Sequence, residues 1–184
     1  MQRHPLSLGS IELSCCREGW FTPAMISEPK PGEWLEAKDF EHIVRLTPLV
    51  SIDLIVRSPD GRVLVGRRKN APAKDIYFVP GGRITKNETL AEAFRRLTRV
   101  ELGREEQIES AQFRGVYEHI YRDNRMEKAG FGTHYVVLAY EFTLTLDGRE
   151  LPTDQHGDYE WMTVEKLVSS NEVHENTKAY FKPA

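Results

Sequence analysis

The stretch GGRITKNETLAEAFRRLTRVELG, residues 81–103, decides how this chain folds. It begins with a glycine pair shortly after an apolar run at residues 77–79, and it ends with a third glycine. Between the glycines, apolar residues recur at helical spacing, namely Leu90, Ala93, Phe94, Leu97 and Val100. We therefore predict a strand, a glycine turn and a helix over about residues 88–102.

The predicted helix carries signals for both of its ends. Thr85 or Asn87 can cap its start, and Glu88 follows Thr85 at the spacing of a capping box. Gly103 suits the position just after the last turn, because glycine readily adopts the left-handed conformation found there. These signals predict a helix whose two ends are both defined locally.

The segments on either side alternate between strands and helices. Before the glycine pair we predict a helix at residues 34–46 and a hairpin of two strands, 48–57 and 62–67, around a turn at 58–61. After residue 103 we predict strands at 112–121, 133–146 and 159–161, and helices at 163–167 and 173–181. This order predicts an α+β fold, with a mainly antiparallel or mixed sheet packed against helices.

The composition is that of one globular domain. The chain has 184 residues, of which 40% are apolar and 29% charged, and its formal net charge is −3. A weakly acidic protein has no general attraction to nucleic acid, so local cations or a metal must hold any polyphosphate that it binds. No apolar run reaches membrane-spanning length. We therefore expect no nucleic acid and no membrane among its partners.

Residues 1–33 differ from the remainder of the chain. They show no clear period and end in the linker-like sequence SEPKPG, so we expect a poorly ordered N-terminal extension before a domain at residues 34–184. Met25, just before the linker, is a candidate natural start. Cys15 and Cys16 are adjacent, which suits neither a structural disulfide nor a zinc site. With no secretory signal in residues 1–17, we expect a cytoplasmic protein with reduced thiols.

The stretch 81–103 resembles the Nudix box, G-x5-E-x7-R-E-U-x-E-E-x-G-U, in which U is apolar. The residues that match are Gly82, Glu88, Arg96, Glu101 and Gly103. In that family a loop, a helix and a loop hold magnesium against a pyrophosphate, on a mixed β-sheet sandwiched between helices (α/β/α). The alternative is an ordinary amphipathic helix with Arg96 and Glu101 on its solvated face. The preceding strand and the capped helix favour the Nudix box.

Three positions depart from the box. Leu97 and Val100 stand where the family has metal-binding glutamates, and Arg104 replaces its last apolar residue. Leu97 and Glu101 are four residues apart and lie on one helical face, so that face keeps one carboxylate. One carboxylate should hold one Mg²⁺, completed by a backbone carbonyl, waters and phosphate oxygens. Such a metal suits the neutralisation of a departing diphosphate better than the generation of hydroxide, so the attacking water needs another base.

His156 is the candidate base. It lies in the polar segment LPTDQHGD, residues 151–158, which we predict to be an irregular, exposed loop. Imidazole titrates near physiological pH and is the commonest general base. Gln155 beside it offers a carbonyl oxygen, a suitable hard ligand for Mg²⁺. The alternative is a solvent-exposed loop histidine with no role.

Over roughly residues 40–181 the chain is similar to one branch of the Nudix superfamily, the GDP-mannose mannosyl hydrolases. The similarity lies in the modified box, the Gln155-His156 pair and five runs: TPLVS at 47–51, FVPGGR at 78–83, FRRLT at 94–98, THYVVL at 133–138 and AYF at 179–181. These enzymes attack C1 of the sugar instead of phosphorus, and they release GDP and the sugar with inverted anomeric configuration. The resemblance implies GDP-mannose or a related GDP-hexose as the substrate, and a homodimer as the assembly.

The resemblance also implies a metal site and a general base. The backbone carbonyl of Gly81, the carboxylate of Glu101 and the side chain of Gln155 would hold one Mg²⁺, with Mn²⁺ as an alternative ion. His156 would deprotonate the attacking water.

Three more residues are implied around the leaving group. Arg68 would stabilise the departing diphosphate, which gains negative charge as the C1–O bond breaks, or else it is a surface arginine at a strand end. Asp53 would stabilise the positive charge that grows at C1, and an aspartate in this apolar strand is costly without a partner or a function. Tyr135 would donate to a phosphate oxygen, with a core tyrosine as the equal alternative.

Further residues are assigned to substrate binding. Arg83 and Arg96 would support the site, although Arg96 could simply pair with Glu88 and brace the loop. His119 is another candidate, or else an inward-facing strand histidine that a neighbour satisfies.

Two other functions compete with hydrolysis at carbon. A conventional Nudix pyrophosphohydrolase would attack phosphorus, and water labelled with heavy oxygen separates it from attack on the sugar. A non-catalytic nucleotide-sugar sensor on the same scaffold is the alternative from a different class. The presence of His156, Gln155 and Glu101 argues against the sensor.

Overall fold

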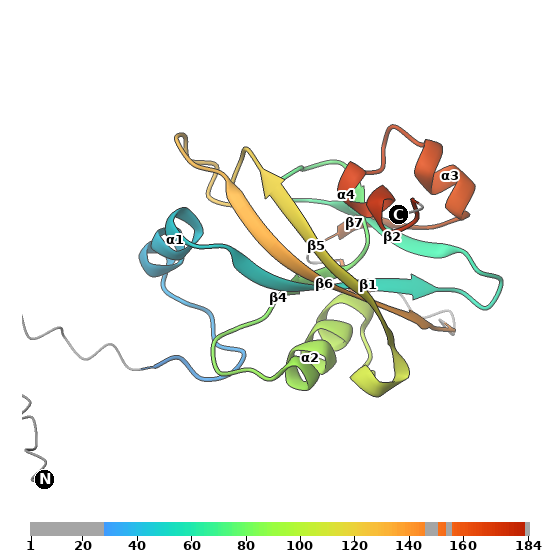
Figure 1. The fold of residues 1–184 in the computed structure, drawn as a ribbon, viewed down its shortest axis with the longest axis horizontal. Coiled ribbons are helices and arrows are strands. Elements are labelled where there is room, and N and C mark those ends of the chain that lie inside the picture. Colours follow the sequence, from blue (N-terminus) through green and yellow to red (C-terminus); the bar gives the residue numbers. More distant parts are fainter. Residues whose placement is uncertain (1–27, 146–150, 154–155, 183–184) are drawn as a thin grey trace, which may run out of the picture.

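A mixed seven-stranded β-sheet carries the fold in the computed structural model, which describes residues 28–145, 151–153 and 156–182 (Figure 1). The elements in chain order are α1 Ala37–Leu46, β1 Leu49–Arg57, β2 Val63–Arg68, β3 Tyr77–Phe78, β4 Gly81–Arg83, α2 Leu90–Leu102, the short 3₁₀ helix η1 Ile108–Ser110, β5 Gln112–Tyr121, β6 Thr133–Thr143, β7 His156–Met162, α3 Val164–Ser169 and α4 Glu175–Ala179. The sheet runs β3-β2-β1-β6-β5, with β4 paired to β1 and β7 paired to β2. Strands β1 and β6 are parallel, and the other pairs are antiparallel. The predicted mixed sheet of an α+β fold is therefore confirmed.

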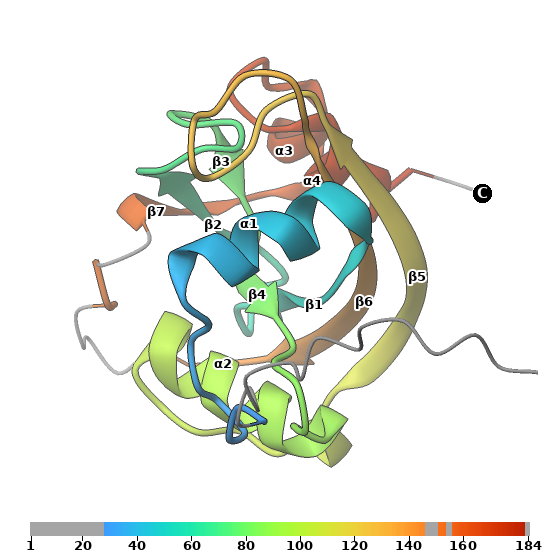
Figure 2. The ribbon, with the colours of Figure 1, turned by 90° about the vertical axis from the view of Figure 1, so that its left-hand side faces the viewer.

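The core lies on both faces of this sheet, because β1 is buried on both sides. Ile52 and Leu54 pack with Phe94 of α2 on one face. Ile55 points the opposite way, as successive strand residues do, and packs with Leu167 of α3 on the other face. Figure 2 shows α2 on one side of the sheet and α3 and α4 on the other. The helices thus sandwich the sheet, which confirms the expected α/β/α layering.

Helix α2 begins later than the sequence predicted. Its cap is Thr89 instead of Thr85 or Asn87: the Thr89 hydroxyl accepts from the backbone N–H of Glu92, and the Glu92 carboxylate accepts from the N–H of Thr89. Thr85 and Glu88 do form hydrogen bonds with each other, but in the turn before the helix. Two capping-type pairs follow each other in the sequence, and only the second one starts the helix.

The buried face of α2 also differs from the predicted apolar stripe. Leu90 and Val100 are 44% and 41% exposed, whereas Thr98 and Glu101 are buried. The Thr98 hydroxyl accepts from the backbone N–H of Glu106, in the segment after the helix, and Glu101 turns towards His156 of β7. Gly103 ends the helix with φ of 72°, in the left-handed conformation that its position required.

The segment around His156 is not the exposed loop that the sequence predicted. Strand β7 begins at His156 and pairs antiparallel with β2, which places His156 opposite Arg68, and the register is irregular between Gly66 and Arg68. Residues 156–158 carry no strand pattern in the sequence, so we predicted the strand only from residue 159. The neighbouring strand extends it, because backbone hydrogen bonding does not depend on side-chain pattern.

Residues 28–33, which we assigned to the N-terminal extension, contact the turn before α2. The backbone N–H of Gly32 donates to the Thr85 hydroxyl at 2.8 Å, and the Asn87 amide donates to the carbonyl of Pro29 at 3.2 Å. Residues 15, 16 and 25, the two cysteines and the candidate start, lie outside the described residues, as does the predicted end of the 133–146 strand. The extension at residues 1–33 therefore stays a prediction.

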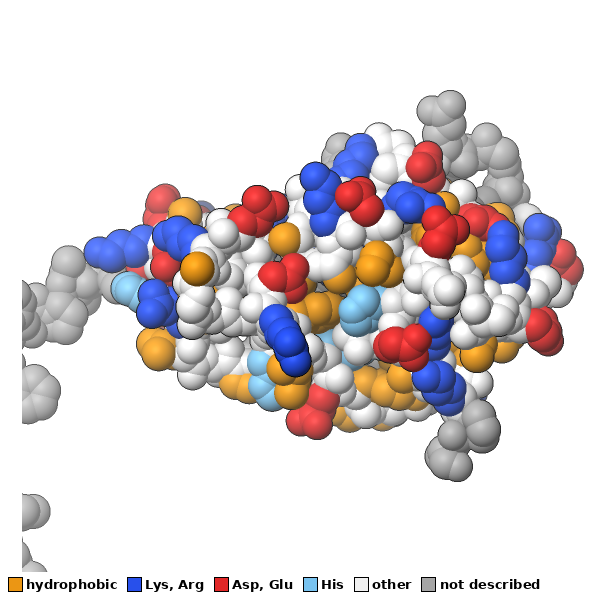
Figure 3. Space-filling view, turned by 90° about the horizontal axis from the view of Figure 1, so that it is seen from above, with side chains coloured by type: hydrophobic (Ala, Val, Ile, Leu, Met, Phe, Trp, Pro, Cys, Tyr) orange, Lys and Arg blue, Asp and Glu red, His pale blue; other side chains and the backbone are white. Residues whose placement is uncertain are grey.

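The surface mixes charges of both signs. On the face seen in Figure 3, the basic and acidic side chains of the described residues are interspersed. Within the described ranges, no helix combines the length and the apolar character needed to cross a membrane.

Replacing the residue that caps α2 should weaken the fold. Thr89→Ala removes one side of the capping box and should lower the free energy of unfolding by about 1 kcal/mol, measured by urea denaturation. Thr145→Ala is a matched control, because Thr145 is exposed and caps no helix; its effect should stay within roughly 0.5 kcal/mol. Equal stability of the Thr89→Ala variant and the unchanged protein would contradict this assignment of the cap.

Candidate active site

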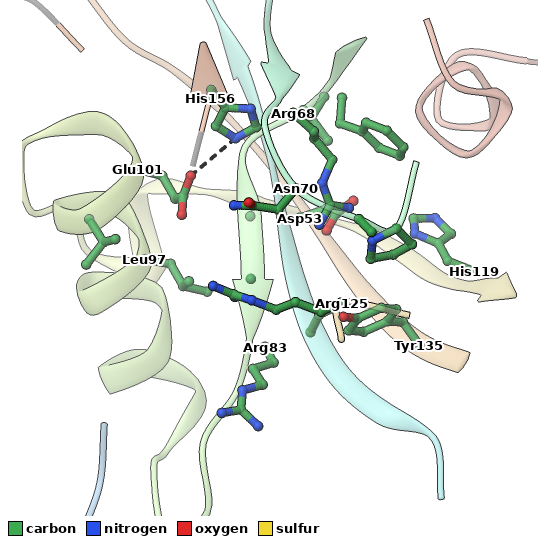
Figure 4. A pocket seen from close by; sticks show the side chains of 18 of the residues that line it. Asp53, Arg68, Asn70, Arg83, Leu97, Glu101, His119, Arg125, Tyr135 and His156 are labelled. Carbon is green, nitrogen blue, oxygen red and sulfur yellow. Dashed lines mark ion pairs between the residues drawn. The ribbon is translucent and has the colours of Figure 1, made fainter. Parts of the chain in front are cut away.

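One pocket gathers the predicted site residues where β1, β2, β4, α2 and β7 meet (Figure 4). The predicted residues that line it are Asp53, Arg68, Gly81, Arg83, Arg96, Glu101, His119, Tyr135 and His156. Gln155, the predicted third metal ligand, lies outside the described residues. Leu97 also lines the pocket, so the position where the family has a glutamate presents an apolar side chain to it.

The glycine pair allows the close packing that forms the pocket. A Cβ atom on Gly81 would lie 2.5 Å from the backbone oxygen of Ile52, and one on Gly82 would lie 2.7 Å from a methyl carbon of Leu97. The backbone of Ile52 leaves no room for a side chain at residue 81, whereas a side chain at residue 82 would have to displace the end of Leu97. The glycine pair thus lets β4 approach both β1 and α2 closely. In the resulting register Gly81 lies opposite Asp53.

An ion pair braces the loop between β4 and α2. Nε and Nη2 of Arg96 donate to the two oxygens of Glu88 at 2.6 and 2.8 Å, and Nη2 also donates to the carbonyl of Arg83 at 2.9 Å. Burial alone would raise the pKa of Glu88, but hydrogen bonds from Arg96 and the N–H of Thr85 hold this pKa below its ordinary value. The guanidinium of Arg96 is thus engaged by the loop, as the bracing alternative anticipated.

Glu101 and His156 face each other inside the pocket. They are 3% and 4% exposed, and Oε2 of Glu101 lies 3.3 Å from Nε2 of His156 (Figure 4). This contact is an ion-pair distance without hydrogen-bond geometry: Glu101 Oε2 has no hydrogen-bond partner among the described residues. His156 packs over Gly66, where a Cβ atom would lie 2.5 Å from the imidazole ring. The glycine therefore makes room for the ring.

The orphaned oxygen of Glu101 fits a bound cation. A buried carboxylate oxygen without a hydrogen bond is costly, and a cation removes this cost. Within the described ranges, no three His, Cys, Asp or Glu side chains come close enough together to hold a metal ion. Further ligands here would be oxygens of other kinds, such as the backbone carbonyl of Gly81, which lines the same pocket.

Asp53 is half-buried and accepts a hydrogen bond from Tyr180, the residue that follows α4. The Tyr180 hydroxyl donates to Oδ2 of Asp53 at 2.6 Å. Burial raises the pKa of Asp53 to about 6, against the hydrogen bond from Tyr180 and the nearby charge of Arg68, which both lower it. Asp53 therefore has the partner that its position in an apolar strand requires, and it stays largely ionised at neutral pH.

Arg68 and Tyr135 contribute polar groups to the pocket opposite α2. The guanidinium carbon of Arg68 lies 5.2 Å from the centre of the Phe78 ring. Burial raises the pKa of the Tyr135 hydroxyl, against the nearby charge of Arg68, so this hydroxyl keeps its proton and can donate a hydrogen bond. Both side chains come from strands, β2 and β6, whose backbone is held by the sheet.

His119 is neutral and has a neighbour that satisfies it. Its Nε2 lies 3.2 Å from the Tyr180 hydroxyl, and burial lowers its pKa to about 4, with the charge of His174 acting in the same direction. At neutral pH this imidazole does not change its protonation state. His119 lines the pocket. Its contact with Tyr180 also fits the alternative of an inward-facing strand histidine that a neighbour satisfies.

Several residues that the structure places at this site were not predicted from the sequence. Trp34, Asn70 and Arg125 line the pocket, and Tyr180 holds Asp53. Asn70 and Arg125 lie in segments without periodic pattern, so their direction had no local signal. Trp34 stood at the start of the predicted helix 34–46, but α1 begins only at Ala37. Tyr180 belongs to the run AYF, which marked the similarity but indicated no role.

The sequence matches the family model of the NUDIX domain over residues 47–183. It is 42% identical over 127 residues to the low-salt glycan biosynthesis protein Agl8 of Haloferax volcanii, a match that covers 69% of this chain and 78% of that protein. It is 36% identical over 106 residues to the ADP-ribose pyrophosphatase of Methanocaldococcus jannaschii, covering 58% of this chain and 56% of that protein.

Solved structures share the fold. The MutT NUDIX hydrolase from Burkholderia pseudomallei superposes with a TM-score of 0.58 at 26% identity, over 73% of this chain and 95% of that one. The NUDIX domain of Shewanella oneidensis NrtR, solved with ADP ribose, gives a TM-score of 0.56 at 14% identity, over 80% and 96% of the two chains. The glycine pair of β4, the capped helix and the family match across most of the sequence agree, and the chain therefore belongs to the Nudix family.

Proposed function

We propose that the protein hydrolyses a nucleotide sugar, GDP-mannose or a related GDP-hexose, by attack of water on C1 of the sugar with inversion. One observation carries this proposal: the pocket beside α2 holds a single helical carboxylate, Glu101, and that carboxylate faces His156. Leu97, one helical turn earlier, supplies no ligand for a second metal. One metal ion can neutralise the diphosphate as it leaves carbon, and a separate imidazole can take the proton of the attacking water.

The residues around Glu101 suit one divalent cation, Mg²⁺ or alternatively Mn²⁺. The carbonyl of Gly81, the carboxylate of Glu101 and the side chain of Gln155 would hold it. When bound, the ion neutralises negative charge on the departing diphosphate. The proposal gains support from the orphaned oxygen of Glu101, the one buried carboxylate oxygen in the described pocket without a hydrogen bond.

His156 serves as the general base in this proposal. The water oxygen forms a bond to C1 while the bond from C1 to the diphosphate oxygen breaks, and the electron pair stays on the nucleotide. Nε2 of His156, the ring nitrogen that faces Glu101, takes the proton of the water. This nitrogen lies 3.3 Å from Oε2 of Glu101, so the base stands beside the proposed metal ligand.

Asp53, Arg68 and Tyr135 act on the charges that develop as the bond breaks. The ionised Asp53 stabilises positive charge at C1. Arg68, whose charge lies near Asp53, and the protonated hydroxyl of Tyr135 stabilise the growing negative charge on the diphosphate. A site with one anion for the sugar and several donors for the leaving group matches cleavage of a glycosyl phosphate.

The relatives support a sugar nucleotide and also define the second candidate. The relative from Haloferax volcanii is a glycan biosynthesis protein, which favours a substrate with a sugar. The relative from Methanocaldococcus jannaschii is an ADP-ribose pyrophosphatase, which favours attack on phosphorus. The two reactions differ in the bond that water breaks.

Water labelled with ¹⁸O distinguishes these two reactions. With GDP-mannose and Mg²⁺ we expect the label in the released hexose, unlabelled GDP, and an initial sugar anomer opposite to that of the substrate, read by mass spectrometry and proton NMR. Label in a phosphate product would assign the protein to the pyrophosphohydrolases instead. GDP-glucose and ADP-ribose serve as comparison substrates.

Loss of the imidazole should lower turnover while leaving binding nearly intact. We expect His156→Gln to reduce kcat by about a hundredfold or more, with little change in the affinity for GDP. Gly66→Ala should act in the same direction, because its Cβ would displace the ring. His42→Gln, a matched change at an exposed position of α1, should leave kcat unaltered. A normal rate for His156→Gln would remove it as the base.

Loss of the Glu101 carboxylate should weaken metal activation. Glu101→Gln should raise the Mg²⁺ concentration for half-maximal activity by about tenfold or more, because it removes the anionic ligand. Glu105→Gln makes the same change at an exposed position outside the pocket and should not alter the metal dependence. If both variants respond to Mg²⁺ as the unchanged protein does, Glu101 is not a ligand.

A further inference from the structure

Two arginines and two aromatic rings line the pocket at the end away from His156. The guanidinium carbon of Arg83 lies 4.1 Å from the centre of the Phe40 ring and 4.8 Å from that of Trp34. The guanidinium carbon of Arg125 lies 5.7 Å from the Trp34 ring. We refer to Trp34, Phe40, Arg83 and Arg125 as the Trp34 cluster. Figure 4 shows Arg83 and His156 at opposite ends of the pocket, with Arg125 reaching in between them.

The loop that carries Arg125 is held in place by a buried side chain. Asn124 is fully buried, its amide donates to the carbonyls of Lys128 and Phe131, and its oxygen accepts from the N–H groups of Met126 and Lys128. The same loop is tied to α1 by an ion pair between Lys128 and a glutamate of that helix. Arg125 therefore enters the pocket from an ordered loop.

Among the described residues, the two guanidinium groups of the Trp34 cluster have no acidic partner. Neither Arg83 nor Arg125 forms an ion pair with an acidic side chain among the described residues, and Nε of Arg83 is buried without a hydrogen-bond partner. The acidic side chains that line the described pocket are Asp53 and Glu101, and both belong to the end where the chemistry is proposed. The end with the Trp34 cluster therefore offers hydrogen-bond donors and aromatic ring faces. A ligand that binds there should carry hydrogen-bond acceptors.

The positions of Gly81 and Arg83 on β4 show how far the Trp34 cluster lies from the proposed diphosphate site. Gly81, at the proposed metal site, and Arg83 are two residues apart on one strand, which separates them by about 7 Å. A nucleotide sugar with C1 near His156 places its diphosphate beside Gly81 and its nucleoside further along the same line. The Trp34 cluster lies where that nucleoside must extend.

We propose that Trp34 and Arg125 form the nucleobase subsite: the base stacks on the Trp34 ring, and Arg125 donates to acceptors on its edge. The inference rests on the proposed function for the position of the diphosphate. Trp34 is 61% exposed, so its ring is open to a ligand. Guanine presents two acceptors, O6 and N7, on one edge, whereas adenine pairs its N7 with an amino donor. A subsite whose polar group is an arginine, with no carboxylate beside it, thus selects guanine over adenine.

Calorimetric binding in the presence of Mg²⁺ tests this subsite without any turnover. The ligands are GDP, ADP and inorganic pyrophosphate, and the variants are Trp34→Leu and Arg125→Met. We expect each variant to lose about tenfold or more in affinity for GDP, with pyrophosphate affinity unchanged. Trp34→Phe should retain most of the GDP affinity because it keeps a ring. Arg122→Met, at an exposed position of the same loop outside the pocket, should bind GDP normally.

Three outcomes would overturn the subsite. An equal loss for GDP and pyrophosphate would make Arg125 a phosphate ligand. Unchanged GDP affinity in both variants would place the base elsewhere. Equal affinity of the unchanged protein for ADP and GDP would reject selection by arginine donors. Failure of the proposed function is separate, since it would appear as intact GDP binding without release of sugar from GDP-mannose.

Discussion

The close approach of β4 to both β1 and α2 is the constraint on which the site depends. A larger residue at Gly81 would collide with the backbone of β1, and one at Gly82 would have to push the end of Leu97 aside. Because these surfaces touch, Asp53 comes opposite Gly81 and the carboxylate of Glu101 turns towards the same pocket. The Glu88–Arg96 pair then holds the connecting loop against α2, so the parts keep one geometry.

The distribution of charge in the pocket decides which chemistry it favours. Several carboxylates on α2 would concentrate metal ions and support hydroxide attack on phosphorus. This pocket instead places an apolar Leu97 one helical turn before a single Glu101, and an imidazole faces that carboxylate. Under the proposed function this arrangement suits a departing anion better than an activated metal-bound nucleophile, and Asp53 is the residue assigned to the positive charge on the sugar.

Much of the fold was predictable, because its signals are local. Helical spacing and the final glycine located α2 to within two residues at its start and correctly at its end. The predicted cap was wrong because two similar capping patterns follow each other, and only packing selects between them. The prediction of an exposed loop at His156 was wrong for a related reason: polar residues gave no strand signal, yet pairing with β2 buries the ring over Gly66.

The sequence by itself determined most helices and strands, the place of the glycine pair and the absence of carboxylates at residues 97 and 100, since propensity, spacing and residue identity are properties of neighbouring positions. The turn predicted at the glycine pair was wrong, because pairing with β1 makes residues 81–83 the strand β4. The tertiary structure alone decided which groups meet. The hydrogen bond from Tyr180 to Asp53 joins residues 127 positions apart, and Arg125 reaches the pocket from a loop without any pattern. Such contacts depend on burial and on the path of distant backbone segments, which no local pattern encodes.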